Sequence, residues 1–407
     1  MPAAGSLEEA TGSEEDVNYI NVWKRYESDL EESLTDPSWS IFEFIETIPV
    51  RRELVRVVGM FLVHRILRGT QYENKVDLRA VSAFLGMVQA GYKQTYGYHT
   101  MIHSADTAIT IYHMIQVFEE PKGIHPLDEL AAVLAAFGHD VGHPGWSNSL
   151  AKALGMGEAE DPHPLESMHA RETTRMLSIA GLDGLLGDRR VRMMEEMIVC
   201  TCMDYHTFML EKARTYAAED LQTRLSILLH CADISNPTKE AKLSQQWSIR
   251  CSFEFWREHD LSREIGVVPP PSVPPRSLTS PGYALCQLGF YKNVALPLFE
   301  ALDSESEWAC RLRCNIQARI DLIAAYAPTR STVASVTWQP TAAEASQPIE
   351  EREAVVVIED QAEPSCSEDG IPSATPSLSS DPIIIDGGLS SHRRRSSLFR
   401  IAAAGGK

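Results

Sequence analysis

The chain has 407 residues, of which 44% are hydrophobic, and a formal net charge of -19. This apolar content is enough for a substantial core, while a globally acidic surface argues against non-specific binding to nucleic acid or anionic membranes. No apolar stretch approaches membrane-spanning length, and the first residues lack the basic and apolar segments of a signal peptide. We therefore expect a cytoplasmic protein with no transmembrane segment and no nucleic-acid partner.

The order of elements along the chain predicts one helical domain. Residues 1–36 are acidic with few aromatic residues, which is typical of a disordered N-terminus. Apolar residues then recur at helical spacing, and few stretches alternate with period two. We predict an all-α fold, a single compact multi-helix domain over 37–330, with helical segments at 42–48, 54–67, 80–92, 105–115, 127–137, 170–182, 191–203, 221–234, 243–256, 289–302 and 309–326.

Two stretches are not expected to be helical. The prolines of 267–282 exclude a helix and predict a long loop. Residues 331–407 are of low complexity, rich in Ser, Pro, Ala and Glu with a basic end, and are expected to be disordered.

The first polar cluster is YHTMIHSAD at 98–106. Four-residue spacing places His99 and His103 on one helix face, and Asp106 follows on the same side. The polar face of an amphipathic helix is an alternative explanation for such a pair taken alone.

Two further clusters close apolar helices. GHDVGHPGWSN at 138–148 ends one predicted helix, and LLHCADISNPTK at 228–239 ends another, where helix capping is the alternative. Together with the first cluster they supply two imidazoles and two carboxylates, which suit Zn²⁺, while a shared carboxylate can bridge to Mg²⁺ or Mn²⁺. The candidate ligands are His103, His139, Asp140 and Asp233.

The cysteines do not form a recognisable metal motif. Cys200 and Cys202 are too close for a CxxC motif, and Cys310 and Cys314 lack a second Cys or His pair. We do not expect cysteine ligands from these spacings.

These clusters resemble the catalytic domain of the class I 3′,5′-cyclic-nucleotide phosphodiesterases, which are HD-type metal-dependent phosphohydrolases. The resemblance covers roughly residues 38–328. YHTMIHSAD is similar to YHNxxHAxD, GHDVGHPGWSN to HDxDHPGxxN, PLESMHA to the LENHH stretch, TCMDYH to TDMxxH, ADISNPTK to ADxSNPTK, and CQLGFYKNVALPLFE to SQxGFxxxxxxPLF. The resemblance implies an all-α fold and an enzyme that hydrolyses a cyclic nucleotide to the 5′-monophosphate.

The resemblance also implies roles for individual residues. The four candidate ligands would hold the first metal, expected to be zinc, and Asp140 would bridge to a second, magnesium or manganese. A hydroxide between the two metals would attack the phosphate, and His99 would be the general acid. His143, Glu166 and Thr201 match positions around the metals and their waters.

The substrate side of the site follows from the same comparison. Tyr98, Asn236 and Gln287 match substrate-binding positions, and Phe290 would stack on the base, although a core aromatic is the alternative for Phe290. SNPTK and the following QQW favour cyclic AMP, with cyclic GMP as the alternative substrate.

Several motif positions depart from the family pattern. Thr100, Gly142, Ser167, Met168 and Cys202 replace the expected residues, and two carboxylates near the second metal are lost with Gly142 and Cys202. A catalytically weak homologue that binds cyclic nucleotide, as a sink or regulatory subunit, is therefore a second hypothesis. A third, another HD phosphohydrolase acting on nucleotides, is disfavoured by the segment that contains Gln287 and Phe290.

The C-terminal stretch SSHRRRSSLFRI at 390–401 resembles a site for cyclic-AMP-dependent protein kinase. Arg394 and Arg395 precede Ser397 at the spacing of that recognition motif, and Ser396 also follows arginines. Phosphorylation would add negative charge beside these arginines. A solvated charge cluster or a weak membrane-surface patch is the alternative.

Overall fold

The computed structural model describes residues 20–326 except 37, 50–52, 94–96, 159 and 271–272. Within this range the regular structure is helical with no strand, which confirms the prediction of an all-α fold. No helix in the same range is both long and apolar enough to cross a membrane. The predicted low-complexity tail 331–407, with Ser396 and Ser397, lies outside the described residues.

Every predicted helical segment overlaps a helix, although no helix was predicted at 148–153, 206–213 or 281–288. The bounds of the α-helices are α2 Glu27–Glu32, α3 Ile41–Thr47, α4 Leu54–Leu67, α5 Leu78–Gly91, α6 Met101–Phe118, α7 Pro126–Gly138, α8 Asn148–Ala153, α9 Pro164–Ile179, α10 Asp183–Val199, α11 His206–Ala213, α12 Leu221–Asp233, α13 Ala241–Glu264, α14 Pro281–Phe290, α15 Leu296–Asp303 and α16 Glu307–Tyr326. Short 3₁₀ turns link several of them: η1 Val22–Tyr26, η3 Glu120–Lys122, η4 Met203–Tyr205, η5 Tyr216–Ala218 and η6 Asn236–Thr238.

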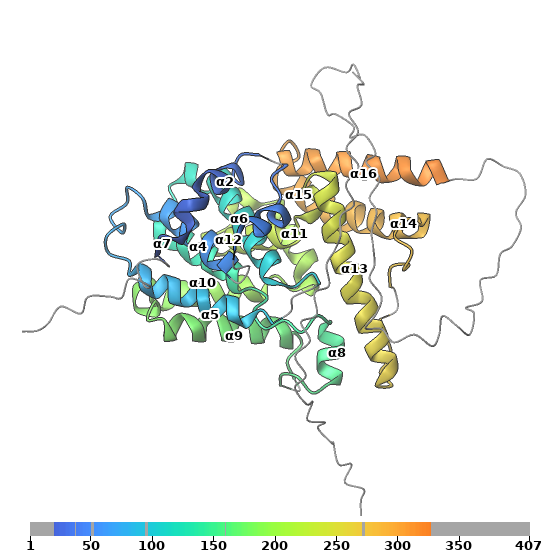
Figure 1. Cartoon of the computed structure of the whole chain (residues 1–407), viewed down its shortest axis with the longest axis horizontal. Helices are drawn as coiled ribbons and strands as arrows, with labels where there is room; N and C mark the ends of the chain where they lie inside the picture. The colour runs from blue at the N-terminus through green and yellow to red at the C-terminus, as the bar shows by residue number, and fades with distance from the viewer. Residues whose placement is uncertain are drawn as a thin grey trace, which may run out of the picture. The chain divides into compact units, whose positions relative to one another are not determined.

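The centre of the core is built from four helices. Helix α6 packs against α4, α7 and α12, and these helices lie side by side in Figure 1. Helix α7 is buried along almost its whole length, because its residues after Glu129 are apolar on every face. Because α7 is buried, the residues that follow it, His139 and Asp140, lie in the interior.

A second group of helices lies beside this centre. Helices α14 and α16 pack together, and α13 passes next to them in Figure 1. The described part of the proline-rich stretch forms the loop between α13 and α14 up to Ser280, as predicted, but Pro281 and Gly282 already belong to α14. Trp256 Nε1 donates to the Pro274 carbonyl at 2.7 Å. This contact fixes part of the loop against α13.

The segment between α14 and α15 contains a π-helical turn, η7 Tyr291–Ala295. Pro297 lies two residues after its end and has no N–H to donate to the carbonyl four residues earlier. Such breaks are commonly accommodated by π-bulges. The π-helical turn begins directly after Phe290.

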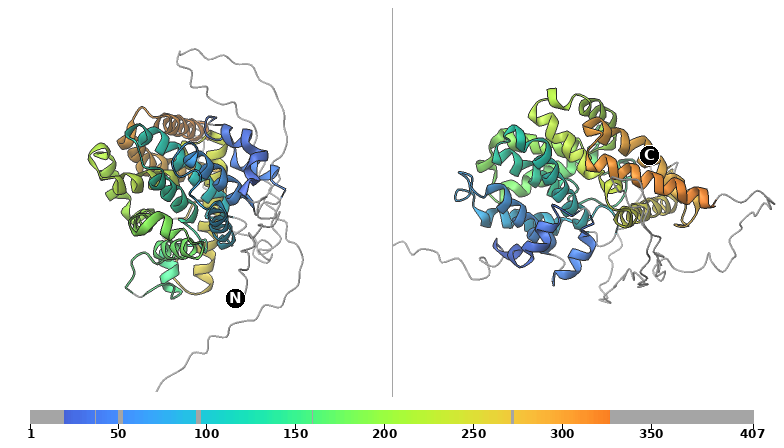
Figure 2. Two further views of the ribbon diagram at one scale, coloured as in Figure 1. Left: turned by 90° about the vertical axis from the view of Figure 1, so that its left-hand side faces the viewer. Right: turned by 90° about the horizontal axis from the view of Figure 1, so that it is seen from above.

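The N-terminal segment 20–36 differs from its prediction as disordered. Residues 20–36 were assigned to a disordered N-terminus, but Val22–Tyr26 and Glu27–Glu32 are helical, and Trp23 and Leu30 are buried. Figure 2 shows these blue helices packed against the helical body. Composition misses this segment because a few apolar side chains at the right spacing are enough to dock an acidic helix.

Candidate metal centre and its surroundings

Four polar side chains meet where three core helices approach each other. His103 comes from α6, His139 and Asp140 follow the end of α7, and Asp233 is the last residue of α12. One ligand atom from each of them lies within 4.8 Å of all the others. His103 and His139 are fully buried, so the sequence clusters converge inside the protein rather than on a polar surface.

The hydrogen bonds at this point leave room for a cation. His139 Nδ1 lies 2.7 Å from the Ala136 carbonyl and must donate to it. In a neutral imidazole, His139 Nε2 then carries a lone pair, yet it faces Asp140 Oδ2 at 3.1 Å and Asp233 Oδ1 at 3.3 Å. Asp140 Oδ2 is buried without a hydrogen-bond partner. Electron pairs that converge in this way fit a positive ion.

The charge balance supports the same conclusion. Burial disfavours a charged imidazole, but the carboxylates of Asp140 and Asp233 nevertheless raise the pKa of His139 well above its usual value. His103 Nε2 also lies 2.9 Å from Asp233 Oδ1. A positive charge between the two carboxylates is therefore stabilising. Two imidazole nitrogens with two carboxylate oxygens are a suitable ligand set for a divalent metal ion.

His99 lies beside this centre and is held by a carboxylate from another helix. Glu254 of α13 contacts His99 Nδ1, and its other oxygen accepts from the backbone N–H groups of Tyr98 and His99 at 2.8 and 3.0 Å. Burial lowers the pKa of His99, but the negative charges of Glu254, Asp140 and Asp233 together outweigh this effect and raise the pKa to about 9. Glu254 therefore orients the His99 ring and favours its protonated form.

Two more histidines extend the cluster. The ring of His143 stacks on that of His99, with centroids 3.7 Å apart, and on that of His169 at 5.4 Å. His169 Nδ1 lies 2.8 Å from the Val141 carbonyl, and its Nε2 lies 3.9 Å from Asp140 Oδ1. His143 thus lies between the rings of His99 and His169, outside the group of four candidate ligands.

Glu166 and Thr201 lie farther out. Glu166 accepts a hydrogen bond from Asn148 Nδ2 at 2.8 Å. The Thr201 hydroxyl donates to the Ile198 carbonyl at 2.8 Å, so it closes the end of α10. Neither of these hydrogen bonds involves one of the four candidate ligands.

Tyr98 and Asn236 lie at the edge of the centre. The Tyr98 hydroxyl donates to the Asp233 carbonyl at 3.1 Å and accepts from Asn236 Nδ2. The Tyr98 ring also lies 4.4 Å from the ring of His103. The structure therefore joins these two predicted substrate residues to the predicted ligands.

Gln287 and Phe290 lie on α14. Arg319 Nε of α16 donates to Gln287 Oε1 at 3.1 Å. Because a guanidinium has only donors, the amide oxygen must face it, and Gln287 Nε2 is left buried without a hydrogen-bond partner. Phe290 is 37% exposed, which is inconsistent with its alternative role as a core aromatic.

Sequence reasoning did not single out three of these residues. The folded chain brings Glu254 to His99, His169 to Asp140 and Arg319 to Gln287, although each pair is distant in sequence. A signal existed for His169, since it is the last residue of the LESMH motif. No pattern marked Glu254 or Arg319, which lie in ordinary amphipathic helices.

The fold and this site define a helical protein with a candidate divalent-metal centre. The family model for 3′5′-cyclic nucleotide phosphodiesterase matches residues 98–309, and this chain belongs to that family.

Individual relatives agree with this assignment. The chain is 28% identical over 247 residues to the dual specificity calcium/calmodulin-dependent 3′,5′-cyclic nucleotide phosphodiesterase 1B of Bos taurus, covering 57% of this chain and 46% of that protein. It is 26% identical over 323 residues to the 3′,5′-cyclic-AMP phosphodiesterase 4C of Mus musculus, covering 73% and 45%. The chain thus spans about half the length of the curated relatives that it matches.

A solved structure has the same fold. The structure of LmjPDEB1 in complex with IBMX superposes with a TM-score of 0.59 at 19% identity, covering 73% of this chain and 98% of the other. At this identity the likeness concerns the fold.

Proposed function

We propose that this chain hydrolyses 3′,5′-cyclic nucleotides to the 5′-monophosphates, with cyclic AMP preferred over cyclic GMP, and so ends cyclic-nucleotide signalling. The observation that carries the proposal is the meeting of His103, His139, Asp140 and Asp233 beside His99. Family membership and the names of the relatives support the substrate class.

The four residues would hold one divalent ion, proposed to be zinc, and Asp140 would reach a second, magnesium or manganese. When bound, such ions offset phosphate charge and make water acidic enough to act as a nucleophile near neutral pH. The four ligand side chains are supplied by the interior of the protein. His139 Nδ1 donates to the Ala136 carbonyl, and this hydrogen bond orients the ring so that Nε2 can coordinate the ion.

His99 would donate the proton. Opening the cyclic phosphate leaves negative charge on the ribose O3′, which requires an acid beside it. Glu254 holds Nδ1 of His99, so Nε2 is the nitrogen that can donate. The stacked ring of His143 restricts the orientation of the His99 ring.

The base would be bound by Gln287 and Phe290, with Tyr98 and Asn236 lining the pocket. The buried, unpartnered Gln287 Nε2 supports this role, because it offers a donor to an acceptor atom on the base edge. The exposed Phe290 ring is available for stacking. The likeness of SNPTK and QQW to cyclic-AMP-selective members supports the preference for cyclic AMP.

Gln287→Ala is expected to raise the KM for cyclic AMP by about 10-fold, the effect of about 1.4 kcal/mol from one lost hydrogen bond. Metal content should not change, because Gln287 contacts Arg319 and not the candidate ligands. Steady-state kinetics and elemental analysis check both. Gln317→Ala, on the exposed side of α16, is the matched control, and an unchanged KM in Gln287→Ala would contradict pairing with the base.

The central test of the function is turnover by the purified chain. We expect hydrolysis of cyclic AMP, faster than that of cyclic GMP, that requires added Mg²⁺ or Mn²⁺ and is abolished by a chelator. The replacement of two family carboxylates by Gly142 and Cys202 motivates the second candidate, a binder without turnover. Tight binding of cyclic AMP with no product from either nucleotide would favour that candidate and contradict the proposed activity.

A further inference from the structure

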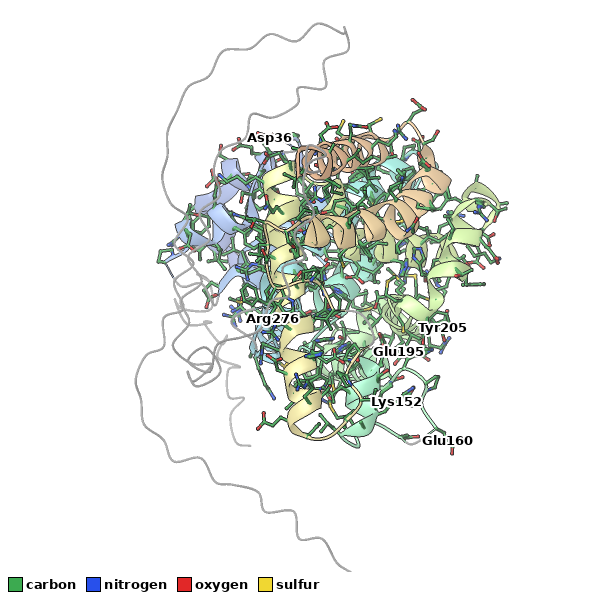
Figure 3. All side chains as sticks on the ribbon, turned by 90° about the vertical axis from the view of Figure 1, so that its right-hand side faces the viewer. Asp36, Lys152, Glu160, Glu195, Tyr205 and Arg276 are labelled. Carbon is green, nitrogen blue, oxygen red and sulfur yellow. The ribbon has the colours of Figure 1, made fainter. Side chains whose placement is uncertain are left out.

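A second group of metal-binding side chains lies outside the four-residue centre. His163 precedes α9, Cys202 follows α10, and Asp204 lies in η4. One ligand atom from each lies within 4.8 Å of the other two. The ring of Tyr205, the residue after Asp204, lies 5.1 Å from that of His163, and Figure 3 labels Tyr205 near the edge of the molecule.

His163 Nδ1 lies within contact distance of two different partners in this group. His163 Nδ1 lies 3.3 Å from Cys202 Sγ and 3.4 Å from Asp204 Oδ2. If Nδ1 carries a proton, it can donate to the carboxylate, and the thiol proton is then left to Glu166, the other acceptor beside Cys202. If Nδ1 carries a lone pair, it can accept from the thiol but repels the carboxylate. One positive ion in place of the thiol proton would satisfy all three atoms.

The distances fit a tetrahedral metal ion. Bonds of about 2.1 Å to nitrogen and oxygen and about 2.3 Å to sulfur imply separations of about 3.6 Å between nitrogen and sulfur and about 3.4 Å between nitrogen and oxygen. The observed separations, 3.3 and 3.4 Å, are close to these values. A thiolate, an imidazole and a carboxylate are all zinc ligands, and three of them leave a fourth position for water.

We propose that His163, Cys202 and Asp204 form a further metal site, separate from the four-residue centre, which binds Zn²⁺ or a similar ion with affinity for thiolate. Cys202 is buried, whereas the side chain of Asp204 is 77% exposed and leaves a path for the ion from solvent. This proposal does not depend on the proposed function, because none of the three residues belongs to the catalytic set.

Metal binding at this site is coupled to release of the thiol proton. Burial and the carboxylate of Glu166 raise the pKa of Cys202 to about 12, so the free thiol keeps its proton at neutral pH. The ion replaces this proton, which leaves to solvent, and a bound thiolate results.

The site would connect two parts of the chain that surround the catalytic centre. It joins the start of α9 to the turn after α10. Glu166, in the first turn of α9, lies next to Cys202 and accepts from Asn148. An ion here would therefore hold α9 and α10 together beside the residues that the family uses around its second metal.

Cobalt provides a direct test with the full chain. Co²⁺ bound to a thiolate absorbs in the near ultraviolet by charge transfer, whereas the four-residue centre offers only nitrogen and oxygen ligands. We expect this band in the unmodified protein, its loss in Cys202→Ala, and its retention in Asp233→Ala. Cys200→Ala, which removes a free thiol two residues away, is the matched control and should keep the band.

A second variant keeps the proposal testable if Cys202→Ala does not fold. Asp204→Asn changes an exposed side chain and should weaken cobalt binding by more than about 10-fold, judged by competition with a chelator, since even indirect contacts to a metal contribute that much. Absence of the band from the unmodified protein, its persistence in Cys202→Ala, or unchanged affinity in Asp204→Asn would overturn the site.

Discussion

His103→Ala is expected to lose metal and turnover together. Its Nε2 lies 2.9 Å from Asp233 Oδ1 inside the buried cluster, and its removal leaves two carboxylates and one imidazole around the ion. Loss of an indirect contact to a metal typically costs 10- to 100-fold in affinity, so loss of a direct ligand should cost more than about 100-fold. Elemental analysis after dialysis, together with the hydrolysis assay, measures both effects. Asp233→Ala should behave in the same way.

The control for this experiment lies on the same helix. His113→Ala replaces a partly exposed histidine of α6 that faces Glu307, and it should keep its metal and its activity. Full metal content in His103→Ala would contradict the assignment of this residue as a ligand. The cobalt–thiolate band should survive in His103→Ala, which separates this site from the one proposed at Cys202.

His99→Asn is expected to lower kcat by roughly 10²- to 10⁴-fold while metal stays bound, because general-acid catalysis contributes about that much. Asparagine keeps a side chain of similar length but cannot supply a proton at neutral pH. Unchanged turnover would mean that another group is the acid. His259→Asn on α13, which replaces a histidine paired with Asp260, is the matched control and should leave kcat unchanged.

The pH profile tests the same assignment through Glu254. An acid acts in its protonated form, so turnover should fall as the pH rises through the pKa of His99. Nearby carboxylates raise this pKa to about 9 against the effect of burial, and the charge of Glu254 contributes most to the rise. Glu254→Gln removes that charge and lowers the pKa. The alkaline fall in kcat should therefore move to lower pH. If the alkaline fall in kcat did not move, this would contradict a role for Glu254 in raising the pKa of the general acid.

Local sequence determined a large part of this protein. The apolar pattern of 54–67 predicted α4 with its observed bounds, because a helix that buries most of its residues needs apolar side chains over most of its surface. The clusters that contain His103, His139 and Asp233 were visible because each lies in or at the end of an apolar helix, where an unpaired polar group is costly. A short docked helix at Glu27–Glu32 was missed, since its acidic composition masks a few buried contacts.

Only the tertiary structure decided which residues from distant segments meet. Glu254 reaches His99 across 155 residues of sequence, and Arg319 reaches Gln287 because α16 packs on α14. His163 and Cys202 are 39 residues apart, in neither a CxxC nor a paired Cys and His motif, so their spacing predicted no ligand role. Sequence periodicity specifies the buried face of each helix, but the positions of helices relative to one another depend on how their side chains pack, and this packing brings such residues within bonding distance.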